Sequence, residues 1–256
     1  VIETPSWINR PDAVLTAWLP GQEGGNSVTD ILTGKENPSG RLPMTWPKRY
    51  ADVPNKNDFP NPDEISDDQI LESLKDLHNK RTEGERKNFD YTEYNDSIYV
   101  GYRYYTTKDI PVAFPFGYGL SYTTFKYSQL SVIKDGQGNL EVKVNVTNKG
   151  KRSGKEVVEV YVAAPGKDMP KPSRELRGFT KTKTLAPGES ETVKINIPYT
   201  SLASFNEKEN QWQVEAGQYV VEVARNAADR APLSKKVMEL AGVTEKVIPS
   251  LLPEQK

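Results

Sequence analysis

AWLPGQEGGNSVTDILTGKENPSGRLPMTWP, residues 17–47, is the stretch around which the chain is organised. Its apolar residues recur at the spacing of one helix face, and they are Val28, Ile31 and Leu32. This spacing predicts a short helix packed on a core, with Asn26 as its cap. Gly34 is expected to end the helix, because glycine readily adopts the left-handed conformation that follows many helices.

The flanks of this helix complete the prediction for the N-terminal part. Residues 37–40, NPSG, predict a turn. Residues 42–47, LPMTWP, predict extended chain, because the residue before each proline is pushed out of the helical region. Upstream, residues 1–4 predict the end of a buried strand, and the apolar residues of 11–19 have the spacing of a second helix face. Residues 1–47 therefore predict the last piece of an α/β domain, which buries too little to fold alone.

Three motifs of the chain resemble signatures of glycoside hydrolase family 3, the β-glucosidases, β-xylosidases and their relatives. The first motif is residues 17–47. The second is YVGYRYY at residues 99–105 with FPFGYGLSYTTF at residues 114–125. The third is RELRGF at residues 174–179 with LAPGE at residues 185–189. All three occur in the order of the family, so the resemblance covers most of the chain.

Composition limits the classes of protein and chemistry that remain. The formal net charge of −1 over 256 residues offers no electrostatic argument for binding nucleic acid or a membrane surface. The absence of cysteine excludes disulfides and thiolate chemistry but leaves the cellular compartment open. No apolar run approaches the roughly 20 residues of a membrane-spanning helix. The chain opens on Val1 and not on Met, so we expect the C-terminal part of a longer polypeptide, for which a missing leader is uninformative.

Two segments are expected between the N-terminal piece and the next domain. Residues 48–97 are polar and interrupted by proline, and they predict an inserted linker with one helix that begins at the capping box of residues 66–69. Residues 98–124 predict an aromatic connector between domains. Its aromatic rings either fill the contact between domains or form a platform on which sugars stack, and we favour the first role.

From residue 125 onward the apolar residues alternate with polar ones, and turn signals separate the runs. This pattern predicts an antiparallel β-sandwich over residues 125–240, with residues 233–240 as a possible last strand and residues 241–256 as a tail. Without a Cys–Trp–Cys framework the class is fibronectin type III-like, and the family resemblance implies the same fold. The basic stretch of residues 167–177 is expected to be an exposed loop of the sandwich. The fold class is thus mixed, the end of an α/β domain followed by an all-β sandwich.

Candidate acid–base residues come from context. Glycoside hydrolysis needs two carboxylates, about 5–5.5 Å apart for retention of the anomeric configuration. The candidates are Glu3, Glu23 and Asp30, and flanking glycines make Glu23 the most accessible to a ligand. A role for Glu23 in capping or bracing the glycine turn is nevertheless favoured, because isolated carboxylates at helix starts are usually caps. Glu23 and Tyr118 are the two candidates for substrate binding.

Other chemistries find no support in the sequence. The single histidine, His78, cannot supply a zinc site or a serine-hydrolase triad, and it falls on the apolar stripe of the predicted linker helix. No metal site is therefore predicted. Residues 21–25 lack the Lys and Ser/Thr of a phosphate-binding loop.

The resemblance implies where catalysis would occur. In the family the nucleophile is an aspartate of the first domain and the acid/base is usually a glutamate of the second domain, upstream of Val1. Neither motif occurs here, so no catalytic residue is assigned to this chain. The implied enzyme is a retaining, exo-acting β-glycosidase of glucosides or xylosides. It needs no cofactor, is secreted or periplasmic, and has its own N-terminal catalytic domains and a glycoside as partners, with no nucleic acid and no membrane span.

A second hypothesis remains open. The chain could be a non-catalytic binding module that holds glycans or a protein partner with the aromatic loop of residues 116–122. The N-terminal piece favours the first hypothesis, because half an α/β unit needs a partner to cover it.

Overall fold

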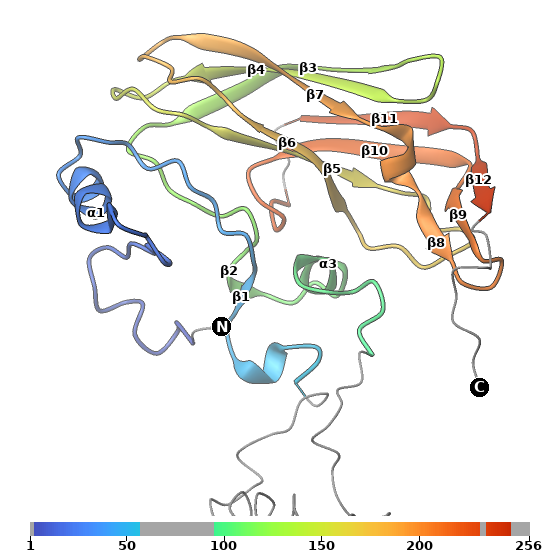
Figure 1. Cartoon of the computed structure of the whole chain (residues 1–256), viewed down its shortest axis with the longest axis horizontal. Helices are drawn as coiled ribbons and strands as arrows, with labels where there is room; N and C mark the ends of the chain where they lie inside the picture. Colours follow the sequence, from blue (N-terminus) through green and yellow to red (C-terminus); the bar gives the residue numbers. More distant parts are fainter. Residues whose placement is uncertain (1–2, 57–94, 231–233, 247–256) are drawn as a thin grey trace, which may run out of the picture.

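The computed structural model describes residues 3–56, 95–230 and 234–246. Its largest part is a β-sandwich of two antiparallel sheets (Figure 1). The first sheet, in spatial order, contains β3 (Phe125–Lys134), β4 (Leu140–Asn148) and β7 (Ser190–Ile197). The second contains β11 (Ser234–Leu240), β10 (Gly217–Ala224), β5 (Val157–Ala163) and β6 (Glu175–Lys181). The predicted sandwich is therefore confirmed.

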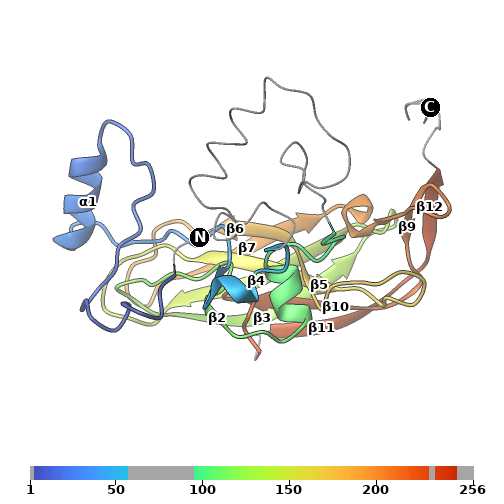
Figure 2. The ribbon, with the colours of Figure 1, turned by 90° about the horizontal axis from the view of Figure 1, so that it is seen from below.

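Smaller elements complete the described part of the chain. A three-stranded sheet at one end of the sandwich contains β12 (Val243–Lys246), β9 (Gln211–Val214) and β8 (Ser204–Asn206). The N-terminal part contributes α1 (Gly24–Leu32), β1 (Trp46–Pro47) and a 3-10 turn (Tyr50–Asp52). The connector contributes α3 (Tyr102–Thr107) and β2 (Val112–Phe114), and a second 3-10 turn, Tyr199–Leu202, follows β7. Figures 1 and 2 show these N-terminal and connector elements on the β5–β6 side of the sandwich.

The core lies between the two sheets of the sandwich. The side chains of β4 alternate strictly between buried and half-buried, as a strand with one face on a core requires. Its inward residues are Leu140, Val142, Val144 and Val146, each at most 1% exposed. The opposite sheet contributes Val158, Val160, Val221 and Val223, all fully buried. The alternation in the sequence thus identified the residues that hold the two sheets together.

The helix expected over residues 11–19 is wrong, because residues 13–18 have no regular structure. Their apolar side chains remain open, with Val14 49% and Trp18 54% exposed. A short amphipathic segment gains little from helix formation unless its apolar face packs on a surface. Residues 37–40 also run without the predicted turn, as part of an extended passage toward β1.

The helix expected within residues 17–47 is confirmed as α1, and Gly34 follows it with φ of +73°. Its start differs from the prediction. The N-cap position belongs to Glu23, and Asn26 lies inside the helix, where its Nδ2 donates to the Glu23 carboxylate at 2.6 Å. The predicted packing of α1 on a core is not found among the described residues, and Leu32 is 68% exposed.

The basic stretch of residues 167–177 also differs from its prediction as an exposed loop. Lys171 is nearly buried and pairs with Glu215 at 3.7 Å, while Arg174 pairs with Glu222 at 3.3 Å. Glu215 also accepts bonds from the backbone N–H groups of Lys167, at 2.7 Å, and of the two residues that follow it. Burying the Glu215 carboxylate requires these donors, so the stretch is fixed on the sandwich instead of being a free loop.

Five strands of the described structure were not predicted as strands from the sequence, namely β2, β6, β8, β9 and β12. The last of these lies within the predicted tail. The predicted linker helix and His78 fall in residues 57–94, outside the described part of the chain. No helix among the described residues is long and apolar enough to cross a membrane.

We predict that Gly178 of β6 is required for close packing of β6 against β7. A Cβ at Gly178 would lie 2.5 Å from the Ile195 side chain, which is closer than two non-bonded carbon atoms approach. Gly178→Val should therefore lower the free energy of unfolding by about 1–3 kcal/mol, measured by urea denaturation. Gly136→Ala is the matched control, because no atom lies within 4 Å of the added carbon. Equal stability of the two variants would contradict the prediction.

Candidate functional site

The N-terminal part meets the connector and the sandwich along residues 37–47. The backbone N–H of Leu42 donates to the carbonyl of Tyr118, and the N–H of Gly117 donates to the carbonyl of Leu42, both at 2.8 Å. Gly119 has no room for a Cβ, which would overlap the carbonyl oxygen of Gly40. The glycines of the connector motif therefore let two backbones run in contact.

Asn37 joins three parts of the chain. Its Oδ1 accepts from the backbone N–H of Tyr122 at 2.8 Å and from the Ser121 hydroxyl at 3.0 Å. Its Nδ2 donates to the carbonyl of Ser153 at 2.9 Å. Tyr122 in turn donates from its hydroxyl to the carbonyl of Ile31 at 2.8 Å. Residues of the first and second motifs are thus in direct contact, which explains why both carry specific polar side chains.

A buried ion pair anchors the N-terminal part to the sandwich. Nη2 of Arg41 lies 2.8 Å from Oε2 of Glu156, and the two side chains are only 11% and 7% exposed. The Tyr127 hydroxyl donates to the other carboxylate oxygen, Oε1, at 2.8 Å. Burial and the nearby Glu156 charge raise the pKa of Tyr127, so its hydroxyl stays protonated and remains a donor. Both oxygens of the buried carboxylate therefore have partners.

A second carboxyl group, Glu159 of β5, lies nearby. It accepts a bond from the Tyr161 hydroxyl at 2.7 Å, and a Cβ on Gly117 would overlap it. Burial raises the pKa of Glu159 to about 7, because desolvation and the charge of Glu156 outweigh the Tyr161 bond and the charge of Arg41. Glu159 therefore keeps its proton to a higher pH than an ordinary glutamate does.

Aromatic rings fill the space around these carboxyl groups. Tyr102 of α3 lies with its ring centroid 4.9 Å from that of Phe116 and 6.0 Å from that of Tyr161. Its hydroxyl accepts from the backbone N–H of Leu176 at 2.8 Å. This packing supports the favoured role of the connector as contact between parts of the chain.

The predicted site residues lie apart from this network. Glu23 is exposed at the start of α1, where its carboxylate accepts the Asn26 bond but makes no capping bond to backbone. Tyr118 is half-buried, with its ring centroid 5.1 Å from that of Phe114. The structure does not bring Glu23 and Tyr118 together through any recorded contact among the described residues, and their roles in substrate binding stay predictions.

The other two carboxylates are also held locally. Glu3 accepts from the backbone N–H of Ser6 at 3.1 Å, and Asp30 pairs with Lys35 at 3.0 Å. Among the described residues no group of three or more His, Cys, Asp and Glu side chains is placed to hold a metal ion.

Sequence reasoning missed Glu156 and Glu159. The available signal was the position of the two carboxylates in an apolar segment. Glu156 directly precedes β5 and Glu159 lies within it, and the strand otherwise consists of Val, Tyr and Ala. A charge in such a segment requires a buried partner. The partner itself could not be predicted, since Arg41 is 115 residues away in sequence from Glu156.

Two protein families match parts of the chain. A family described as the glycosyl hydrolase family 3 C-terminal domain matches residues 1–122, and one described as the fibronectin type III-like domain matches residues 156–227. These matches fall on the N-terminal part with its connector and on the sandwich, respectively.

Curated relatives and a solved structure agree with these matches. Beta-glucosidase B of Emericella nidulans is 36% identical over 87% of the chain and 25% of the relative. An exo-alpha-(1->6)-L-arabinopyranosidase of Bifidobacterium breve is 37% identical over 96% of the chain and 29% of the relative. The structure of beta-glucosidase 3B from Thermotoga neapolitana in complex with alpha-D-glucose superposes with a TM-score of 0.81 and 41% identity, over 96% of the chain and 31% of that structure. The chain thus spans between a quarter and a third of the length of these proteins.

We predict that Arg41→Met destabilises the chain by about 3–5 kcal/mol in urea denaturation, because it leaves the buried Glu156 carboxylate without its counter-ion. Lys35→Met removes an ion pair in which the lysine side chain is 71% exposed, and it should change stability by no more than about 0.5 kcal/mol. Adding Glu156→Gln to Arg41→Met should recover part of the loss. A loss for Arg41→Met as small as that for Lys35→Met would contradict the buried ion pair.

We predict that Glu159→Gln stabilises the chain at pH 8 but not at pH 4.5. The folded-state pKa lies above the usual glutamate value, so the native protein holds its proton more tightly and loses stability as pH rises toward 7. A neutral glutamine avoids this loss, with a gain of about 1–3 kcal/mol at pH 8. Glu141→Gln is the control, since Lys143 and Lys194 lower the pKa of Glu141, and it should give no gain at pH 8. A pH-independent effect of Glu159→Gln would refute the assignment.

Proposed function

The chain belongs to glycoside hydrolase family 3, and from this we propose that it is the C-terminal portion of a retaining, exo-acting β-glycosidase, in the first instance a β-glucosidase. The complete enzyme would hydrolyse terminal β-linked sugars from oligosaccharides, without a cofactor. In this proposal the sandwich stabilises the catalytic domains, and the chain itself supplies no catalytic pair.

One observation carries the proposal, the apolar surface left open on the N-terminal part. Its exposed residues are Val14, Leu15, Trp18, Leu19 and Leu32, from 42% to 98% exposed. Large apolar side chains exposed together in one part of a chain favour a contact with another protein segment. Relatives three to four times as long as the matched stretch contain additional chain that could cover it.

The local bonds of the candidate carboxylates agree with catalysis elsewhere. Each carboxylate of Glu3, Glu23 and Asp30 bonds to a residue no more than five positions away. A retaining glycosidase instead opposes two carboxylates across a sugar. We therefore place the nucleophile and the acid/base in domains that precede this chain.

The residues that select the sugar would also lie outside this portion of the enzyme. Relatives over the same stretch include proteins named as β-glucosidases and as an arabinopyranosidase, at similar identity to the chain. A role in polysaccharide degradation and a secreted or periplasmic location belong to the same proposal and rest on family resemblance.

The proposal is tested by assaying the complete gene product and the 256-residue chain side by side with aryl β-glucoside, aryl β-xyloside and aryl α-L-arabinopyranoside. We expect turnover by the complete product and none by the chain alone, with the fastest substrate naming the sugar. Turnover by the chain alone, lost in Glu23→Gln or Asp30→Asn, would overturn the placement of the catalytic pair. Inactivity of both proteins on all three substrates would favour the non-catalytic binding module.

The proposal that another segment covers the apolar surface is tested in the complete gene product. Leu19→Asp should lower the melting temperature and the recovered activity, because a charge would enter a buried contact. Ile133→Asp is the matched control, since Ile133 is also an exposed apolar residue but lies on β3 of the sandwich, at 53% exposure. An equal effect of the two substitutions would contradict a contact at residues 14–32.

A further inference from the structure

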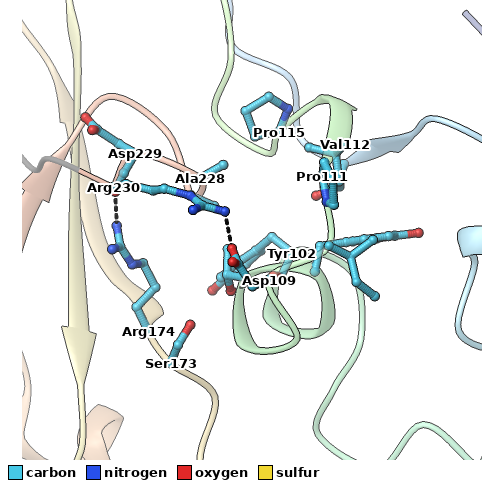
Figure 3. Close-up of a pocket in the computed structure, with 15 residues that line it drawn as sticks. Tyr102, Asp109, Pro111, Val112, Pro115, Ser173, Arg174, Ala228, Asp229 and Arg230 are labelled. Atoms are coloured by element: carbon cyan, nitrogen blue, oxygen red, sulfur yellow. Dashed lines mark hydrogen bonds and ion pairs between the residues drawn. The ribbon is translucent and has the colours of Figure 1, made fainter. Parts of the chain in front are cut away.

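A cavity of about 400 Å³ lies between the connector and the sandwich (Figure 3). Its walls come from Thr45 before β1, from α3 and the residues that follow it, from Ser173 and Arg174 before β6, and from the loop after β10. This volume falls within the range of small-molecule sites in proteins, about 300–1,000 Å³.

The apolar part of the wall is small and rigid. It includes Pro111, Val112, Pro115 and Ala228, which Figure 3 shows around the upper half of the opening. Tyr102 closes the wall from α3 and is fixed there, because its hydroxyl already accepts the Leu176 N–H. Such a surface suits the C–H face of a saturated ring rather than a long flexible chain.

The charged groups of the wall are already balanced. Arg174 pairs with Glu222 at 3.3 Å and donates to the carbonyl of Asp229 at 2.8 Å. Arg230 forms an ion pair with Asp109 across the opening (Figure 3). Each guanidinium has a carboxylate partner, and Asp229, which also lines the wall, is not free. Neither an anion nor a cation would therefore gain a free counter-charge. The lining therefore favours a neutral ligand that both donates and accepts hydrogen bonds.

An unpaired hydroxyl gives an independent sign of a ligand. Thr45 lines the cavity and is 8% exposed, and its Oγ1 has no hydrogen-bond partner in the structure. A buried hydroxyl without a partner costs about 1–3 kcal/mol, so such groups are rare unless something binds them. Among the described residues the other orphaned side-chain atom is Oγ1 of Thr4, which is not part of this cavity wall.

From these observations we propose that the cavity bordered by Thr45, Tyr102 and Asp109 binds a neutral pyranose unit of a saccharide. The apolar wall packs on the C–H face of the ring, and the Asp109 carboxylate, the Ser173 hydroxyl and Oγ1 of Thr45 bond to its hydroxyl groups. The site is lined by residues of this chain. Its occupancy is therefore measured independently of the activity test, and neither result depends on the other.

The experiment titrates the ¹⁵N-labelled 256-residue chain with D-glucose and with cellobiose, followed by amide chemical shifts and by calorimetry. We expect saturable binding, with shifts at Ala228 and Ser173. D-glucuronate and D-glucosamine, the anionic and cationic pyranose relatives of glucose, should bind more weakly than glucose. Tighter binding of either charged sugar would overturn the neutral class. An absence of saturable binding for glucose and cellobiose would overturn the proposal as a whole.

Matched variants locate the binding. Thr45→Val should weaken the saccharide affinity about threefold to tenfold, the loss of one hydrogen bond, while leaving the free chain as stable as before or more stable. Thr4→Val removes the other orphaned hydroxyl and should leave the affinity unchanged. Ala228→Trp, at an exposed position of the wall, should abolish binding without unfolding the chain, as checked by the thermal melt. Binding that persists unchanged in both Thr45→Val and Ala228→Trp would refute this location.

Discussion

The arrangement of the N-terminal part on the sandwich depends on one buried ion pair, Arg41 with Glu156. A buried charge is costly unless it is fully paired, so this carboxylate has one low-energy environment, with the guanidinium on one oxygen and the Tyr127 hydroxyl on the other. That requirement sets where residues 37–47 can run. The backbone bonds with the connector, the glycines that permit them and the aromatic packing around Tyr102 follow from that path.

Part of this structure could be predicted from local sequence because local physics produces it. Strand β4 needs alternate residues in the core, and its alternating sequence predicts it. Strand β6 has no such pattern, since its residues are mostly half-buried at the edge of a sheet. The first part of β6 is predicted from the sequence as an exposed loop, and no prediction covers the rest. Residues 11–19 show the reverse case, because their apolar residues have helical spacing but form no helix. The spacing shows that a helix would have an apolar face, but it does not show whether another part of the protein packs on that face.

The junction network and the cavity were beyond such reasoning for a different reason. Arg41 and Glu156 are separated by 115 residues, and Thr45 of the N-terminal part lines one cavity with Arg230, which follows β10. No periodicity connects such positions. The family motifs identified the family, but they gave no information on which polar side chains within them are buried together. Glu159, with a pKa of about 7, shows the difference most clearly, because only its surroundings set that value.

The edge position of β6 has a consequence for how the protein behaves in concentrated solution. An edge strand presents unpaired backbone groups, to which a strand of another molecule can add, and this is a common route to aggregation. Strand β6 carries Phe179 at 68% exposure, which would favour such addition. The strand also carries Lys181 and the ion pair of Arg177 with Glu175, and an approaching strand would have to desolvate these charged side chains. The charged residues of β6 thus oppose edge-to-edge growth of the sheet and help to keep separate molecules apart.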